Sequence, residues 1–198
     1  MSFFLQSKII ARAGIFIALG VLFSQIEIFK MQQGGSVNLC SSLFFVLPGY
    51  FFGFKIGLIA GVIGGLTDFF LNPFVLHPMQ FLLDYIFAFV FLGIGGSLFY
   101  KSQKKYFSLT ASYLIAMFFK FICHFLSGII FFASYAPENM NACLYAFIYN
   151  FSYIWPEIVL SICCINLPVA KNTIENVYLR ENKKGIKVTK RYNEQKPR

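Results

Sequence analysis

The chain has 198 residues, of which 58% are apolar, 20% aromatic and only 13% charged. Soluble domains usually carry about a quarter charged residues, so this composition excludes an ordinary soluble enzyme and favours one membrane domain. The formal net charge is +9, and nine of the 17 Lys and Arg residues lie between Lys171 and Arg198. Such an end is typical of a cytoplasmic tail. Nucleic-acid binding would rest on this charge alone and is not expected.

Six apolar runs follow one another along the chain. They are Ile9–Phe29, Leu39–Phe54, Ile56–Leu71, Met79–Phe99, Phe107–Phe132 and Leu144–Leu167. The second and third have only about 16 residues each, roughly 24 Å of helix, and are expected to form a tight helical hairpin. The first run resembles a signal peptide, but no small-x-small cleavage site follows it, so it is kept as a span. The sequence therefore predicts an all-α membrane protein with six transmembrane helices in residues 1–168 and a basic cytoplasmic tail in residues 169–198.

The Lys and Arg residues fall almost entirely on one side of this arrangement. One side carries Lys8, Arg12, Lys55, the Lys101–Lys105 cluster and the tail, whereas the other carries Lys30 alone. Because cytoplasmic loops are enriched in Lys and Arg, both termini are predicted to be cytoplasmic. A model with five spans would place the basic tail and the Lys101–Lys105 cluster on opposite sides of the membrane, and it is therefore disfavoured.

Small residues mark two helices for close packing, because such faces let backbones approach each other in lipid. They are Ala11, Gly14 and Ala18 in the first helix, and Gly57, Gly61, Gly64 and Gly65 in the third. We expect the face of the third helix to pack inside the bundle. For the first helix, an internal neighbour and an external partner are both open.

Several ionisable side chains lie within the predicted spans, where a charge costs about 2.5–3.5 kcal/mol. They are Asp68, Asp84, Lys120, His124 and Glu157. The predicted topology places most of them in the outer half of the bundle. Asp68 is expected to be a helix-end residue, and Glu157 is open to a structural or a functional interpretation.

One stripe of the fifth helix has the character of a pocket wall. Lys120, His124, Gly128 and Phe132 recur every fourth residue and therefore share one face of the helix. The stripe offers a cation, an imidazole, a gap and an aromatic ring. These groups together indicate a binding site for a small polar molecule.

Residues on the neighbouring helices suit the same site. Asp84 can accept hydrogen bonds from a ligand amine or balance a ligand cation. Tyr85 and Tyr145 can hold a flat or cationic ring, and Asn150 offers both a donor and an acceptor to a heterocycle edge. The alternative is that Asp84 merely pairs with Lys120 or His124 and holds two helices together.

Motifs for other chemistry do not occur in the sequence. There is no Walker A motif, no G-x-S-x-G motif, and only two histidines, too few for a familiar multi-His metal site. The five cysteines have no metal-ligand spacing. We therefore expect neither an enzyme nor a metal or other cofactor. An intramembrane enzyme built on His124 and Asp84 is the least favoured function.

Two separated segments resemble the thiamine-specific substrate-binding (S) components of energy-coupling factor (ECF) transporters. The first is LHPMQFLLDYIFAFVFLG, from Leu76 to Gly93; the second is KFICHFLSG from Lys120, followed by YAPENM from Tyr135 and by Tyr145 and Asn150. The likeness covers nearly all of residues 9–168. It implies an S-component bundle in the prokaryotic plasma membrane that captures thiamine from outside. Its expected partners are a transmembrane coupling subunit and two cytoplasmic ATPases.

The resemblance also assigns roles to individual residues. The implied thiamine-binding set is Asp84, Tyr85, Lys120, His124, Gly128, Phe132, Tyr145 and Asn150, in which the role of Lys120 is open. Gly14 and Ala18 match the small face that this class presents to its coupling subunit. The loop Lys30–Asn38 matches a lid over the pocket.

This sequence departs from the family pattern at several positions. Asp84 stands where Glu is usual, Phe132 where Trp is expected and Gly14 where Ala is usual, and the first loop lacks a Trp. These differences bear on affinity and on the choice between thiamine and its pyrimidine precursors. The alternative functions are an S component for another vitamin or precursor, and a stand-alone proton-coupled transporter that uses Asp84 or Glu157.

Overall fold

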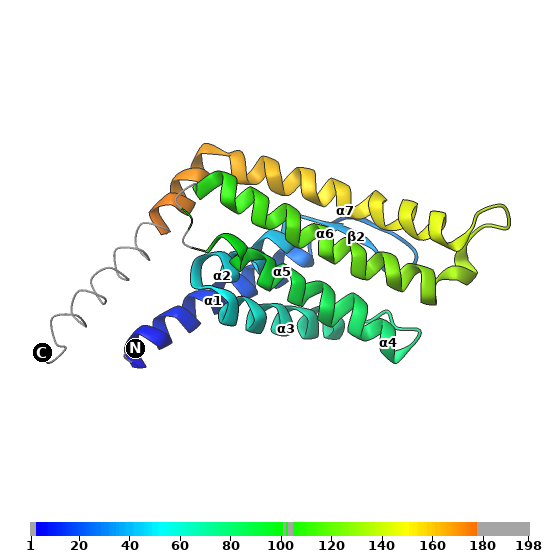
Figure 1. Cartoon of the computed structure of the whole chain (residues 1–198), viewed down its shortest axis with the longest axis horizontal. Coiled ribbons are helices and arrows are strands. Elements are labelled where there is room, and N and C mark those ends of the chain that lie inside the picture. Colours follow the sequence, from blue (N-terminus) through cyan, green and yellow to red (C-terminus); the bar gives the residue numbers. More distant parts are fainter. Residues whose placement is uncertain (1–2, 101, 103–104, 178–198) are drawn as a thin grey trace, which may run out of the picture.

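The computed structural model describes residues 3–100, 102 and 105–177 and shows a helical bundle with one short β-hairpin (Figure 1). The helices are α1 (Phe3–Ser24), α2 (Ser41–Phe52), α3 (Phe54–Leu71), α4 (Pro78–Phe81), α5 (Ala88–Gly96), α6 (Lys105–Phe131) and α7 (Ala142–Asn166). A π-helical segment, η1 (Leu82–Phe87), joins α4 to α5, and short 3-10 turns form η2 (Ser97–Phe99) and η3 (Ala133–Tyr135). The hairpin consists of β1 (Glu27–Lys30) and β2 (Ser36–Asn38).

The six predicted spans correspond to six apolar helical segments. Five are long and apolar enough to cross a membrane: Ser7–Ser24, Phe54–Leu71, Pro78–Phe99, Phe107–Phe131 and Ala142–Asn166. The sixth, α2, has 12 residues, about 18 Å of helix. The predicted all-α membrane class is confirmed, and the hairpin is an addition to it. The first run was expected to continue to Phe29, but α1 ends at Ser24 because the chain then enters β1.

The predicted tight hairpin between the second and third helices is confirmed, and a glycine forms its corner. Gly53 separates α2 from α3 and has a φ of +87°. This backbone conformation is open to glycine but strained for other residues. The corner lets two short helices follow each other with no loop between them.

The bundle brings the basic segments to one end. The start of α1, the junction of α2 with α3, the start of α6 and the end of α7 all lie at the left in Figure 1. Lys8, Arg12 and Lys55 belong to these segments. The prediction that an even number of helices places both ends of the membrane domain on one side is therefore confirmed for the described residues. Residues 168–177 are helical, and the rest of the predicted tail lies outside the described residues.

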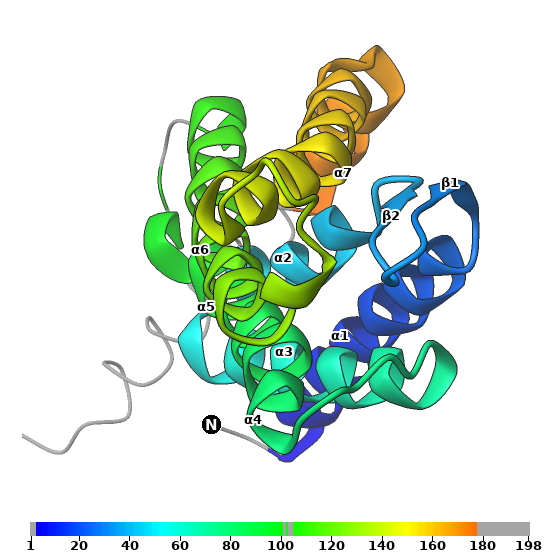
Figure 2. The same cartoon turned by 90° about the vertical axis from the view of Figure 1, so that its right-hand side faces the viewer.

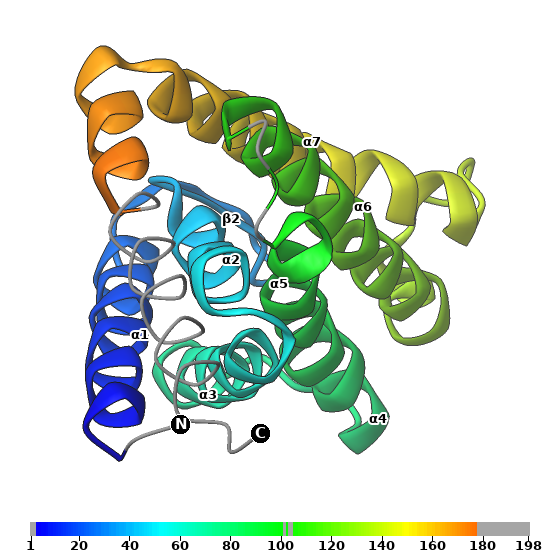
Figure 3. The ribbon, with the colours of Figure 1, turned by 60° about the vertical axis from the view of Figure 1, so that its left-hand side comes forward.

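Helix α5 lies in the middle of the bundle, where it packs against α2, α3 and α6, while α7 packs on α6 (Figure 3). The glycines of α3 face α5 and η1, as predicted. A Cβ on Gly61 would lie 2.5 Å from the carbonyl oxygen of Phe89 and 2.7 Å from the Cα of Val90. The two backbones therefore touch where a side chain would separate them.

Substitution of Gly61 by valine is expected to destabilise the bundle by about 1–3 kcal/mol or more, because backbone rather than a mobile side chain would have to move. The measurement is the thermal unfolding temperature of the purified protein in detergent. Gly14→Val is the matched control, since a Cβ on Gly14 meets nothing within 4 Å. An equal effect of both substitutions would contradict this account of α3.

The β-hairpin lies between α1 and α7 in the end-on view (Figure 2). Its strands are antiparallel, with Glu27 opposite Asn38 and Phe29 opposite Val37. Strand β2 contacts α7. The hairpin thus closes the side of the bundle that α1 and α7 leave open.

Candidate functional site

A cavity lies between α3, η1, α6, α7 and the hairpin. All eight predicted ligand residues line it: Asp84, Tyr85, Lys120, His124, Gly128, Phe132, Tyr145 and Asn150. The space open to the centres of water-sized molecules is about 120 Å³. Roughly 10–15 Å³ on that measure is enough for one water, so the cavity has room for a small organic molecule.

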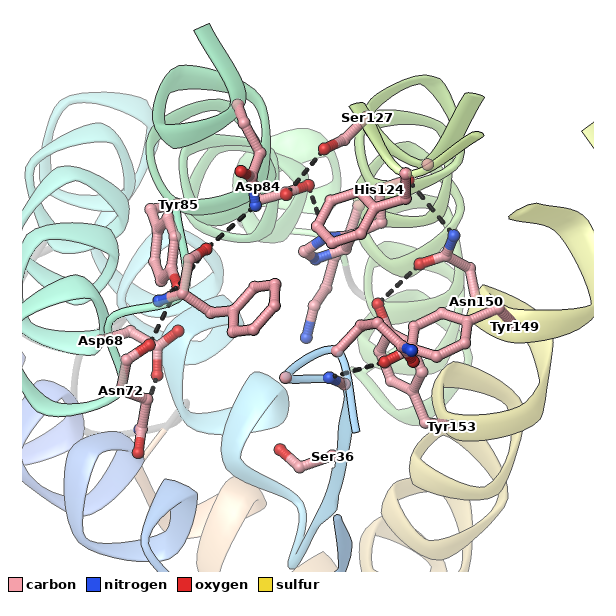
Figure 4. Close-up of a pocket in the computed structure, with 18 of the residues that line it drawn as sticks. Ser36, Asp68, Asn72, Asp84, Tyr85, His124, Ser127, Tyr149, Asn150 and Tyr153 are labelled. Atoms are coloured by element: carbon pink, nitrogen blue, oxygen red, sulfur yellow. Dashed lines mark hydrogen bonds and ion pairs between the residues drawn. The ribbon is translucent and has the colours of Figure 1, made fainter. Parts of the chain in front are cut away.

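Asp84 bridges two side chains of α6. One carboxylate oxygen lies 3.0 Å from Nδ1 of His124, and the other accepts a hydrogen bond of 2.7 Å from the hydroxyl of Ser127 (Figure 4). Of the two pairings foreseen for Asp84 as a helix lock, the structure contains the one with His124. Each carboxylate oxygen can accept more than one hydrogen bond, so the pairing leaves capacity for a ligand donor.

Asp84 and Tyr85 stand in the π-helical segment η1. Such segments are rare and often occur at functional sites, because the extra residue in the turn redirects side chains. The hydroxyl of Tyr85 donates to the carbonyl of Asn72 at 2.9 Å and accepts from the amide of Phe74 at 2.9 Å. Tyr85 was predicted to contact the ligand, and it also holds the loop that follows α3.

Asn150 occupies a fixed position on α7. Its amide nitrogen donates to the carbonyls of His124 and Ala146, at 3.2 and 2.8 Å, and its oxygen accepts from the hydroxyl of Tyr153 at 2.7 Å. A Cβ on Gly128 would lie 2.8 Å from that of Ala146 and 3.2 Å from the Asn150 amide. Gly128 lines the cavity as predicted, and its lack of a side chain also allows the close contact between α6 and α7.

The aromatic walls come from two elements. Phe132 follows α6 directly and stacks on Phe74, with ring centroids 5.9 Å apart and an angle of 18° between the planes. Tyr145 lies beside Tyr149, with centroids 5.9 Å apart, and Tyr153 continues this row along α7. A flat ring between the two walls would meet aromatic faces on both sides.

Lys120 takes part in a buried network with α2 and α7. Its ammonium group donates to the hydroxyl of Ser42 at 2.8 Å and lies 3.5 Å from a carboxylate oxygen of Glu157. The other oxygen of Glu157 accepts from the amide of Ser42 at 3.0 Å and from the hydroxyl of Ser41 at 3.2 Å. Glu157 is 1% exposed. The network therefore gives Glu157 a structural role and matches the charge of Lys120.

The turn of the hairpin contributes to the cavity where the lid was expected. The amide of Gly35 donates to the hydroxyl of Tyr149 at 3.1 Å. A Cβ on Gly35 would lie 2.8 Å from the ring of Tyr153, and one on Gly34 would lie 3.2 Å from the Cβ of Phe74. The two glycines therefore fit between aromatic groups on opposite sides of the cavity.

Several lining residues were not predicted from the sequence. They are Asn72, Phe74, Gln80, Ser127, Tyr149 and Tyr153. Asp68 was expected only as a helix-end residue. The four-residue spacing of Tyr145, Tyr149 and Tyr153 on one helix could have revealed the row on α7, by the argument already used for α6. The sequence marked Asp68 as an ionisable residue within a span, but its place in the cavity could not be predicted because that place depends on how α3 packs.

The bundle and its polar cavity define a multi-pass membrane protein with room for a small molecule between its helices. The comparisons with known proteins specify the family. The family model described as thiamine transporter protein matches residues 10–176. The chain therefore belongs to the thiamine transporter protein family, which is a family of bacterial membrane transport proteins and not of enzymes.

Individual relatives agree with this assignment. The chain is 36% identical to the thiamine transporter ThiT of Bacillus subtilis over 148 residues, which cover 70% of this chain and 76% of that protein. It is 32% identical to ThiT of Lacticaseibacillus paracasei over 104 residues, covering 46% and 52%. The solved structure of ThiT from Listeria monocytogenes shares the fold, with a TM-score of 0.76 at 20% identity over 87% of this chain and 98% of that one.

Proposed function

We propose that this chain is the thiamine-binding S component of an ECF-type importer. The observation that carries the proposal is the lining of the cavity. Asp84 and the side-chain oxygen of Asn150 keep acceptor capacity for an aminopyrimidine edge beside the ring of His124, and the stacked pair of Phe74 and Phe132 offers an aromatic face to a flat ring. Thiamine combines such a pyrimidine with a permanently cationic thiazolium ring.

The direction of capture follows from the charge distribution. The cavity lies on the side of the bundle where α3 ends and η1 begins, away from the basic segments. The positive-inside rule assigns the basic end to the cytoplasm, so the cavity faces the outer half of the membrane. Thiamine would therefore enter from outside.

Energy for transport would come from partners. The proposed partners are a transmembrane coupling subunit and two cytoplasmic ATPases. Gly14 and Ala18 lie on an exposed face of α1, where Ile10 and Leu22 are 63% and 64% exposed. Close approach of another helix to this face would be possible because Gly14 has open space around it.

The test has two parts. Calorimetric titration of the ligand-free protein in detergent should give tight one-to-one binding of thiamine, and folded protein that gives no heat would contradict the assignment of the ligand. Proteoliposomes that contain this chain alone should not accumulate thiamine under a proton gradient. They should do so once the coupling subunit, the ATPases and ATP are added. Accumulation by the chain alone would instead support a proton-coupled transporter.

A further inference from the structure

The carboxylates that line the cavity differ in their partners. They are Glu27, Asp68 and Asp84. Glu27 pairs with Lys30 at 3.1 Å, and Asp84 binds His124 and Ser127. Asp68 receives one long hydrogen bond, 3.4 Å from the side-chain amide of Asn72, and among the described residues no Lys, Arg or His lies within ion-pair distance of it.

The basic side chains Lys120 and His124, which line the cavity, already have acidic partners. Lys120 has Glu157 at 3.5 Å, and His124 has Asp84 at 3.0 Å. Neither Lys120 nor His124 forms an ion pair with Asp68 in the described part of the chain. Of the three carboxylates that line the cavity, Asp68 is therefore the one that has no Lys, Arg or His partner among the described residues. A carboxylate within a membrane span calls for a reason, and a cationic ligand would provide the missing partner.

The position of Asp68 suits one end of an elongated ligand. Asp68 and Asn72 lie on the opposite side of the cavity from Asn150 and Tyr153 (Figure 4). The hydrogen-bonding groups on α6 and α7 therefore face one end of a bound molecule, and Asp68 faces the other. We propose that Asp68 is the counter-ion of the thiazolium ring, an inference that rests on the proposed function. Asp68 would thereby make the cavity prefer a cation to a neutral molecule of the same shape.

The experiment compares two ligands that differ in charge. Thiamine and its uncharged thiophene isostere are titrated by calorimetry into the unaltered protein and into Asp68→Asn. The dissociation constant of thiamine should rise at least tenfold in the variant, about 1.4 kcal/mol. The dissociation constant of the isostere should change less than about threefold. Asp68→Glu, which restores the charge, should recover most of the preference for thiamine.

Controls separate this inference from the proposed function. Glu138→Gln removes the same charge from an exposed loop residue outside the cavity and should leave both affinities unchanged. If Asp68→Asn does not fold, Asp68→Ser removes the same charge with a smaller side chain. If the unaltered protein binds both ligands and the variants leave the ratio of their affinities unchanged, the role of Asp68 is wrong and the proposed function stands. If the unaltered protein binds neither ligand, both the role of Asp68 and the proposed function are wrong.

Discussion

Replacing Asp84 by asparagine should weaken thiamine binding at least tenfold, about 1.4 kcal/mol. Asparagine keeps the shape of the side chain but presents one acceptor oxygen in place of two. One of the two oxygen positions that contact His124 and Ser127, at 3.0 and 2.7 Å, therefore becomes an NH2 group, which donates and does not accept. A hydrogen bond to a charged acceptor is also worth more than one to a neutral amide, so a ligand amine loses affinity as well.

The measurement for Asp84 is again titration with thiamine and with its uncharged isostere. Because Asp84 orients His124 and accepts hydrogen bonds rather than facing the cationic ring, its replacement should weaken both ligands to a similar extent. This pattern differs from the charge-selective loss expected for Asp68. Equal affinities in Asp84→Asn and the unaltered protein, with both folded, would place Asp84 outside the binding site.

The parts of the site that sequence could predict are those fixed by helical periodicity. Lys120, His124 and Gly128 had to share one face of α6 because a helix repeats every 3.6 residues, whatever surrounds it. The apolar runs and the distribution of Lys and Arg likewise determined the six helices and their order. Membranes impose these constraints on any chain, so they can be predicted without knowledge of packing.

The remaining features depend on contacts between distant segments. Glu157 accepts hydrogen bonds from Ser41 and Ser42, which are more than one hundred residues away in the sequence, and no local sequence pattern predicts this contact. No sequence pattern predicts the π-helical turn that carries Asp84 either, because its hydrogen bonds differ from those of an α-helix by only one residue. The hairpin was not predicted: most of β1 was assigned to the first span and β2 to a loop, because four-residue and three-residue strands are too short to show an alternating pattern.

Replacing Glu157 by glutamine should lower the free energy of unfolding by about 3–5 kcal/mol, because it leaves the buried ammonium group of Lys120 without its carboxylate. Glutamine is close to glutamate in size and its oxygen can still accept from the amide of Ser42, so the change is mainly one of charge. The measurement is equilibrium unfolding in mixed detergent micelles. Glu138→Gln, at an exposed position, is the matched control.

A double variant tests whether charge is the cause. Glu157→Gln combined with Lys120→Met removes both charges and should recover much of the lost stability, since the coupling between two contacting residues appears as non-additivity. Additive losses would show that the two side chains act independently, contrary to the 3.5 Å contact. Glu157→Gln alone should also weaken the binding of thiamine more than it weakens the binding of the uncharged isostere, each compared with the unaltered protein. An unmatched Lys120 repels a cation, and Glu157 thereby lets a cavity that contains a lysine accept a positively charged vitamin.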